Sequence, residues 1–229
     1  MHRLPDGCSW GVGALVEPLA CAVHATTDLQ PPCIGATCVV VGPGPLGLLV
    51  ALVVRSRGAR VAVVGRGRRP RRLELARALG IEQVVDIEAD GALDALKRWM
   101  DGGADQVYGC AGGGDAVALG LSLVRRRGRY TELALAGGTV PIDLDTVVRH
   151  EIEIGGAVSH RPESWRLALE LIASGSISTE TLERLITAVY PLERWRAAFD
   201  AAAGRAEGKV LVVPHGATVA SHAGSPPPR

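Results

Sequence analysis

Three glycines in the stretch Gly42-x-Gly44-x-x-Gly47 have the spacing of a loop that brings bare backbone against a pyrophosphate group. Gly42 permits a tight turn, Gly44 removes the side chain where phosphate must approach, and Gly47 lets a following helix pack closely on a strand. Pro45 suits the first turn of that helix, because its missing N–H costs nothing there. The N–H groups of this turn, from Leu46 onward, and the positive end of the helix dipole would face the anion.

An ordinary glycine-rich turn can have the same spacing, so the flanking residues decide between the two interpretations. An apolar strand pattern covers 38–41, a helix pattern covers 46–54, and a second strand pattern covers 60–64. This strand–loop–helix–strand order favours a dinucleotide-binding loop.

The residues after the second strand predict which dinucleotide binds. An NAD-specific protein usually ends this strand with Asp or Glu, which accepts hydrogen bonds from the ribose 2′-hydroxyl. Here the strand ends in Gly65, followed by Arg66 and then by Arg68 and Arg69. Guanidinium groups bind a 2′-phosphate well, so we predict NADP rather than NAD, with Arg66 as the first candidate. The alternative is that these arginines only solvate the start of a helix.

The composition fits a globular protein without a strong electric field. The 229 residues are 47% hydrophobic and 21% charged, with a net charge of +1, so no nucleic-acid or acidic membrane partner is expected. No apolar run has the length of a membrane span. Five cysteines without a CxxC pair or a signal peptide fit a reducing compartment, so we expect a soluble cytoplasmic protein with unpaired thiols.

From residue 38 the chain alternates strand and helix patterns, and the strands are continuously apolar, as in a sheet covered on both faces. This predicts an α/β fold: a doubly wound, parallel, six-stranded Rossmann sheet of order 3-2-1-4-5-6. Strands are expected near 38–42, 60–65, 83–86, 105–110, 129–135 and 151–156. Helices are expected near 45–57, 70–79, 90–100, 114–126 and 163–174.

The two ends of the chain differ from this regular part. A helix is expected within 14–25, a further helix at 191–203 and a last strand at 208–214. We therefore divide the chain into a connecting segment 1–37, a dinucleotide-binding domain 38–160 and a C-terminal unit 161–214 of helices and a strand. Residues 215–229 are rich in Gly, Ser and Pro and are expected to be disordered.

Several stretches together resemble the zinc-type medium-chain alcohol dehydrogenases, in the branch of sorbitol, threonine and glucose dehydrogenases. They are Arg-Leu-Pro-Asp-Gly at 3–7, Gly-Ala-Leu-Val-Glu-Pro-Leu-Ala-Cys-Ala-Val-His-Ala at 13–25, the glycine loop and helix start at 42–49, Arg-Leu-Glu-Leu-Ala-Arg-Ala-Leu-Gly at 72–80 and Gly-Lys-Val-Leu-Val-Val-Pro at 208–214. Val-Tyr-Gly-Cys-Ala-Gly at 107–112 resembles the fourth-strand signature, although Gly109 stands where an acidic residue is common.

The resemblance implies further residues around the nicotinamide. Cys110 and Ala111, at the end of the fourth strand, should border the cofactor cleft. Backbone groups that follow the fifth strand and end the sixth would bind the carboxamide, namely Leu133, Ala134, Leu135, Ile154 and Gly155. Simple loop structure is the alternative for each of them.

The same resemblance implies a barrel-like N-terminal domain that precedes the Glu-Pro motif and carries the zinc ligands. We expect this chain to lack that domain and to keep only remnants of it at both ends. Glu17 matches the carboxylate beside the metal, but one residue cannot supply the three ligands of a catalytic zinc, so zinc is not expected to be retained. Without the partner domain, Val12 to Val23 and Val210 to Val213 should be left bare, and pairing at the sixth-strand edge implies a homodimer or higher oligomer.

Two functions remain open at this point. The first is an NADP- or NAD-linked oxidoreductase for an alcohol, polyol or sugar, for which the sequence identifies no catalytic residue. The alternative is a non-catalytic dinucleotide-binding module or one half of a split enzyme.

Overall fold

The computed structural model describes residues 2–29, 31–32, 34–204 and 208–214. Its centre is a parallel six-stranded sheet of order β3-β2-β1-β4-β5-β6, so the predicted Rossmann topology is confirmed. The strands are β1 (Thr37–Val41), β2 (Arg60–Gly65), β3 (Gln83–Asp86), β4 (Ala104–Gly109), β5 (Val124–Glu132) and β6 (Glu153–Gly156).

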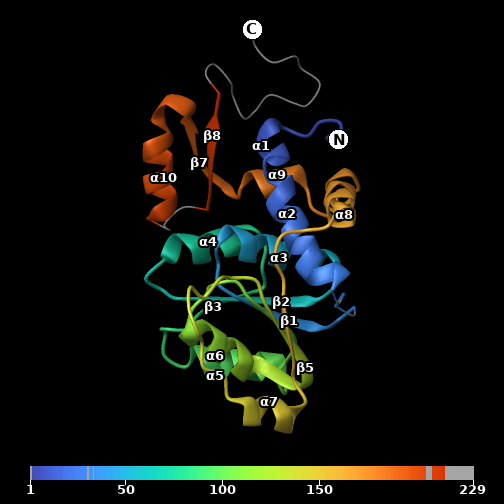
Figure 1. Cartoon of the computed structure of the whole chain (residues 1–229), viewed down its shortest axis with the longest axis vertical. Helices are drawn as coiled ribbons and strands as arrows, with labels where there is room; N and C mark the ends of the chain where they lie inside the picture. The colour runs from blue at the N-terminus through green and yellow to red at the C-terminus, as the bar shows by residue number, and fades with distance from the viewer. Residues whose placement is uncertain (1, 30, 33, 205–207, 215–229) are drawn as a thin grey trace.

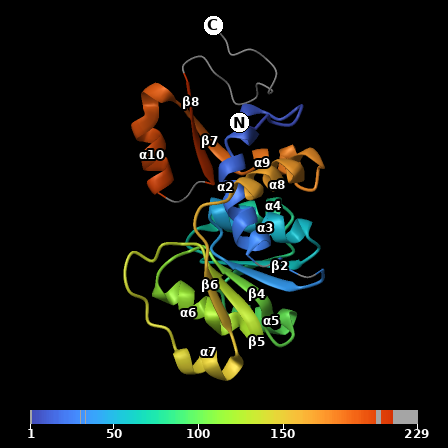
Figure 2. The ribbon, with the colours of Figure 1, turned by 45° about the vertical axis from the view of Figure 1, so that its right-hand side comes forward.

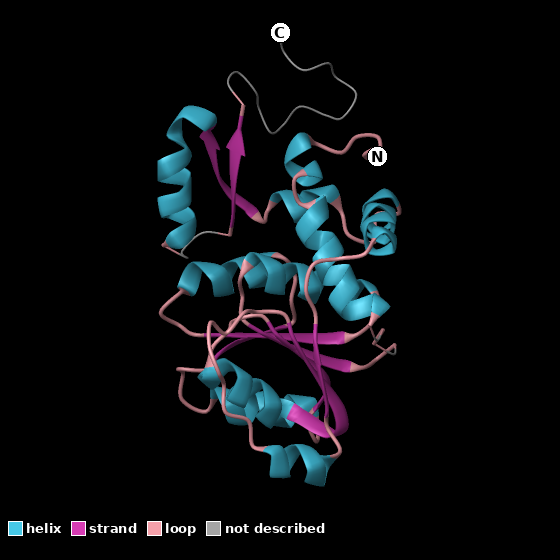
Figure 3. Ribbon diagram, in the orientation of Figure 1, coloured by secondary structure: helices cyan, strands magenta, loops and turns pink. Residues whose placement is uncertain are grey.

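Helices cover both faces of this sheet (Figures 1 and 3). The helices that follow the first four strands are α3 (Pro45–Ser56), α4 (Pro70–Ala78), α5 (Ala92–Met100) and α6 (Gly114–Leu123). Every residue of β1 is buried, and its side chains alternate between two cores. Val40 packs in one core with α3 and α4, whereas Val39 and Val41 pack in the other with α5 and α6. Burial on both faces explains why the strand is continuously apolar.

The N-terminal helices complete the core on the α3 side. They are α1 (Trp10–Gly13), α2 (Val16–Val23) and the π-helical turn His24–Asp28, and they pack with α8 (Pro162–Ala173) and α9 (Thr179–Glu183). Figure 2 shows α2 between α3 and α8. Val12, Val16, Leu19 and Val23 are fully buried, so the expectation that this segment is left bare is wrong. Its apolar residues pack against helices of this same chain.

The C-terminal unit contains a strand that the sequence analysis missed. β7 (Ile186–Pro191) pairs in parallel with β8 (Lys209–Val213), and α10 (Trp195–Ala203) contacts both strands. The expected helix at 191–203 therefore begins later, after a 3₁₀ turn at Leu192–Arg194. In β8, Leu211 is buried while Val212 is 39% exposed, so only part of the expected bare surface is found there.

Two further boundaries differ from the expectations. The expected helix 114–126 ends at Leu123, because β5 begins directly at Val124. Helix α7 (Leu144–His150) was not expected, since it buries no residue and so has no apolar stripe to reveal it. The feature of the sequence that marks the start of α7 is its N-cap residue Asp143. The Asp143 side chain accepts a hydrogen bond from the Thr146 N–H at 3.2 Å.

Among the described residues, no helix combines the length and the apolar character needed to cross a membrane. The expected disordered tail 215–229 lies outside the described residues. The division into units ending at 37, 160 and 214 stays a prediction.

Candidate functional site

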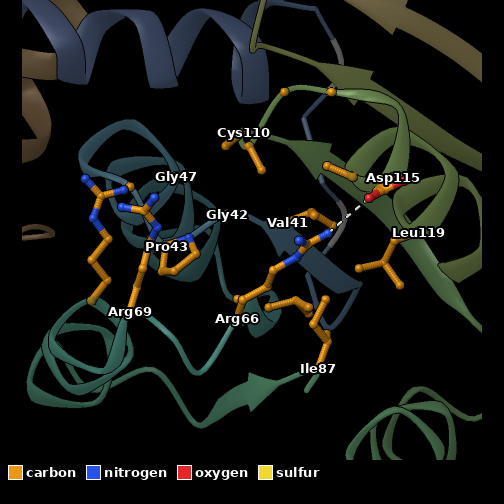
Figure 4. Close-up of a pocket in the computed structure, with 18 of the residues that line it drawn as sticks. Val41, Gly42, Pro43, Gly47, Arg66, Arg69, Ile87, Cys110, Asp115 and Leu119 are labelled. Carbon is orange, nitrogen blue, oxygen red and sulfur yellow. Dashed lines mark hydrogen bonds and ion pairs between the residues drawn. The ribbon is translucent and has the colours of Figure 1, made fainter. Parts of the chain in front are cut away.

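A cleft of about 780 Å³ lies at the carboxyl ends of β1, β2 and β4. This is the edge of a doubly wound sheet at which ligands bind, next to the point where the strand order reverses. Figure 4 shows the lining residues, which come from strand ends that are distant in sequence but adjacent in the sheet. The lining consists of 41–47, 64–66, 68–69, 110–116, Arg72, Ile87 and Leu119.

Two of the three fingerprint glycines are needed for the packing of the protein itself. Gly42 has φ +116°, and a Cβ atom there would lie 2.9 Å from the backbone nitrogen of Ala111. At Gly47 a Cβ atom would lie 2.1 Å from the carbonyl oxygen of Gly42. Contacts this short do not occur in folded proteins, so the helix can approach the loop only because both residues lack side chains.

Gly44 differs from the other two glycines. Its φ of −77° suits any residue, and a Cβ atom there would meet only Nη1 of Arg72, at 3.6 Å. The space beside Gly44 therefore opens into the cleft. Gly44 is also the N-cap of α3, and no side chain caps this helix. The first turn, with Pro45, Leu46 and Gly47, thus presents backbone donors and the positive dipole end to the cleft.

Four arginines line the same cleft: Arg66, Arg68, Arg69 and Arg72. The backbone that carries the first of them is shaped by Asp86 at the end of β3, whose Oδ1 accepts hydrogen bonds from the N–H groups of Gly67 (2.7 Å) and Glu88 (3.0 Å). The sequence analysis named Arg66, Arg68 and Arg69 but not Arg72. Arg72 lies in the first turn of α4, and the direction of this helix brings its side chain beside Gly44.

The cleft also has an apolar side that the sequence analysis did not identify. Ile87 directly follows β3, and Leu119 lies on α6. Asp115 and the glycines at 112–114, which begin or precede α6, were missed too. Their position after a strand was the available signal, because the ends of parallel strands meet at one edge of a sheet. Together these residues give the cleft a lining that combines basic and apolar side chains.

The remaining predicted cofactor residues fall into two groups. Gly65, Cys110 and Ala111 line the cleft, and the Cys110 N–H donates to the carbonyl oxygen of Val41 at 2.8 Å. The other five, Leu133, Ala134, Leu135, Ile154 and Gly155, do not belong to its lining. These residues vary from half-buried to exposed, and Leu135 is 92% exposed. A nicotinamide role for their backbone groups stays a prediction.

The missing carboxylate at Gly109 is replaced by one from the neighbouring strand. A Cβ atom at Gly109 would lie 2.3 Å from Oε2 of Glu132, the residue paired with it in β5. Glu132 accepts hydrogen bonds from the Tyr130 hydroxyl and, at 3.0 Å, from the Ala134 N–H. The departure from the family pattern therefore leaves room for Glu132, which holds the start of the loop after β5.

The expected metal ligand Glu17 lies on α2 with two donor side chains close to it. The Cys21 thiol donates to Oε1 of Glu17 at 3.3 Å, and Nε2 of His160 is 4.0 Å from the same oxygen. Burial and the Glu17 carboxylate raise the pKa of Cys21 to about 11. Among the described residues, no three His, Cys, Asp or Glu side chains are grouped to hold a metal ion. Glu17 therefore does not belong to a three-ligand metal group among the described residues.

The thiol pKa values give a first testable prediction. Burial raises the pKa of Cys38 to about 12, and burial together with the Glu132 carboxylate also raises the pKa of Cys110. Since only the thiolate reacts with iodoacetamide, both should stay unlabelled in the native protein at pH 8 and react fully in denaturant. Mass spectrometry of tryptic peptides measures this. Rapid native labelling of Cys110 would contradict the burial that raises the pKa of this thiol.

Comparisons with known proteins agree with this geometry. Residues 45–174 match the family described as zinc-binding dehydrogenase. The chain is 35% identical over 214 residues to D-arabitol-phosphate dehydrogenase of Enterococcus avium, covering 93% of this chain and 60% of that protein. It is 33% identical over 218 residues to sorbitol dehydrogenase of Halalkalibacterium halodurans, covering 93% of this chain and 62% of that protein.

Solved structures of dehydrogenases have the same fold as this chain. The fold matches 2R,3R-butanediol dehydrogenase from Bacillus subtilis with a TM-score of 0.82 at 26% identity, covering 93% of this chain and 60% of that one. It also matches a putative zinc-binding dehydrogenase from Sinorhizobium meliloti, whose structure contains bound NADP. The TM-score is 0.75 at 29% identity, and the match covers 89% of this chain and 59% of that one. The chain therefore spans about 60% of the length of the relatives it matches.

Proposed function

Because this chain belongs to the zinc-type medium-chain alcohol dehydrogenase family, we propose that its cleft binds a nicotinamide dinucleotide for the oxidation or reduction of an alcohol, polyol or sugar. The geometry at Gly44 is the observation that carries the proposal. Its missing side chain leaves space that the protein itself does not use, in front of an uncapped helix N-terminus. A dinucleotide diphosphate fits both features.

The lining residues also fit the rest of the adenosine half. Ile87 and Leu119 offer apolar contacts for an adenine ring, and the backbone after β2 would carry the ribose. The nicotinamide, when bound, accepts or donates a hydride. The residues of this chain bind and orient the dinucleotide, while the groups that contact the substrate are not identified among them.

We further propose a preference for NADP over NAD. No carboxylate follows β2 directly, and Arg66, Arg68 and Arg69 line the cleft there, where a 2′-phosphate would lie. The bound NADP in the Sinorhizobium meliloti relative supports the same choice.

Arg66→Ala tests this preference. We expect NADPH to bind about 10- to 150-fold more weakly, because a hydrogen bond between charged groups contributes about 1.5–3 kcal/mol, whereas the affinity for NADH changes less than twofold. Fluorescence titration with NADPH and with NADH measures the two dissociation constants. Arg98→Ala, which removes an exposed arginine of α5 outside the cleft lining, is the control. Equal loss for both coenzymes would assign Arg66 to a part of the dinucleotide that NADH shares.

The alternative function is a dinucleotide-binding module without dehydrogenase activity, or one half of a split enzyme. The absence of a three-ligand metal group among the described residues favours it for this chain alone. Reduction of NADP or NAD with a panel of polyols, with and without added zinc, separates the two functions. Binding without turnover supports the module, and zinc-dependent turnover supports the dehydrogenase.

We also propose that the chain forms at least a homodimer. Among the described residues β6 is the last strand of the sheet and pairs with β5 alone, so its other edge offers backbone groups for pairing. Light scattering tests this directly, and a monodisperse monomer at micromolar concentration would contradict it.

A further inference from the structure

An ion pair crosses the cleft in front of the phosphate loop. Nη2 of Arg66, which follows β2, is 3.3 Å from Oδ2 of Asp115, which lies in the first turn of α6 after β4. Since β1 lies between β2 and β4 in the sheet, the pair spans the end of β1 (Figure 4). The two residues are 49 positions apart in sequence, and both line the cleft.

The two side chains differ in their surroundings. The Asp115 side chain is 91% exposed, whereas the Arg66 side chain is only 38% exposed. Within the cleft, Asp115 forms its ion pair with Arg66. Two further carboxylates, Asp86 and Glu88, lie near this end of the sheet but outside the cleft lining, and both accept hydrogen bonds from the backbone. Asp86 holds the backbone at Gly67, and Glu88 accepts from the Arg68 N–H at 3.3 Å. Asp115 is therefore the carboxylate that competes with an incoming anion for Arg66.

We propose that Asp115 is a specificity-determining residue that reduces the preference of this cleft for a 2′-phosphorylated dinucleotide. The inference rests on the proposed function, because it requires Arg66 to meet the 2′-phosphate. A phosphate that binds Arg66 must break the ion pair, and its charge of about −1.5 to −2 then lies close to the Asp115 carboxylate. An unphosphorylated ribose adds no charge at this position. The cost therefore falls on NADP and not on NAD.

Asp115→Asn tests the proposal, since it removes the charge with little change in shape. We expect NADPH to bind about fivefold more tightly, whereas NADH binding changes less than twofold. An exposed pair near water contributes little, which limits the gain to this size. Asp145→Asn is the matched control, because Asp145 also lies in the first turn of a helix, is 79% exposed and pairs with an arginine, but lies outside the cleft lining.

The double variant Arg66→Ala, Asp115→Asn separates competition for Arg66 from general repulsion. If Asp115 acts through Arg66, most of the gain for NADPH disappears in the Arg66→Ala background. An equal gain in both backgrounds, or weaker NADPH binding by Asp115→Asn, would overturn the proposal. Failure of the proposed function looks different, because the unmodified protein would then bind neither NADPH nor NADH, and the inference would fall with it.

Discussion

Replacing Gly44 with alanine is expected to weaken the binding of NADPH and NADH alike by about 10- to 100-fold while the melting temperature stays unchanged. The expected loss corresponds to about 1.4–3 kcal/mol of binding free energy. The new Cβ atom would occupy the space where the diphosphate approaches the backbone, and both coenzymes share that diphosphate. Isothermal titration calorimetry with each coenzyme, together with thermal melting of the apoprotein, measures the two effects separately.

The contrast with Gly47 makes this prediction specific. The structure has free space at Gly44, where the nearest atom to a Cβ is Nη1 of Arg72 at 3.6 Å, but none at Gly47, where the Gly42 carbonyl oxygen would lie at 2.1 Å. Gly47→Ala should therefore lower both binding and the melting temperature, because the helix must move away from the loop. If Gly44→Ala bound both coenzymes as tightly as the unmodified protein, the phosphate site would lie elsewhere.

The part of the site that the sequence predicted is local in the chain. Gly42, Gly44 and Gly47 lie within six consecutive residues, so their spacing alone predicts which positions must lack a side chain. The sheet order was predictable because apolar strands alternate with helices from residue 38, and right-handed crossovers leave few arrangements for such a pattern. Arg66 was found for the same reason, since it directly follows a strand.

The parts that were missed depend on which strand ends meet. Ile87 and Asp115 follow β3 and β4 by one and six residues, and nothing in their own neighbourhoods marks them. They reach the cleft because β3, β2, β1 and β4 are adjacent in the sheet. The substitution of Gly109 was visible in the sequence, but its partner Glu132 was not, because the two meet only through the register of β4 and β5.

The error at Val12 to Val23 has a different origin. The apolar pattern correctly indicated a buried surface but did not identify what buries it. Resemblance to longer relatives assigned that role to another domain, whereas α3, α8 and α9 of this chain supply the contacts. The segment 1–37 thus takes part in the core around the sheet, and this has a measurable consequence.

Leu19→Ala is expected to destabilise the protein by about 2–5 kcal/mol, because Leu19 is fully buried and the truncation leaves a cavity in α2. For a chain of this length the melting temperature should fall by roughly 5–15 °C. Far-ultraviolet circular dichroism and calorimetry should both measure the same fall in melting temperature. Leu135→Ala, at a leucine that is 92% exposed, removes the same atoms and should shift the melting temperature by less than about 2 °C.

The comparison of these two variants distinguishes a core helix from an appended segment. If α2 belonged only to a separate domain, Leu19→Ala would leave the main unfolding transition in place and alter at most a minor one. Because Leu19 shares its core with residues of α3, which begins at the phosphate loop, the structure predicts one transition at a lower temperature and weaker coenzyme binding as that transition is approached. NADPH at about 100 times the dissociation constant of the unmodified protein should then raise the melting temperature of Leu19→Ala, and it should raise that of Gly44→Ala much less.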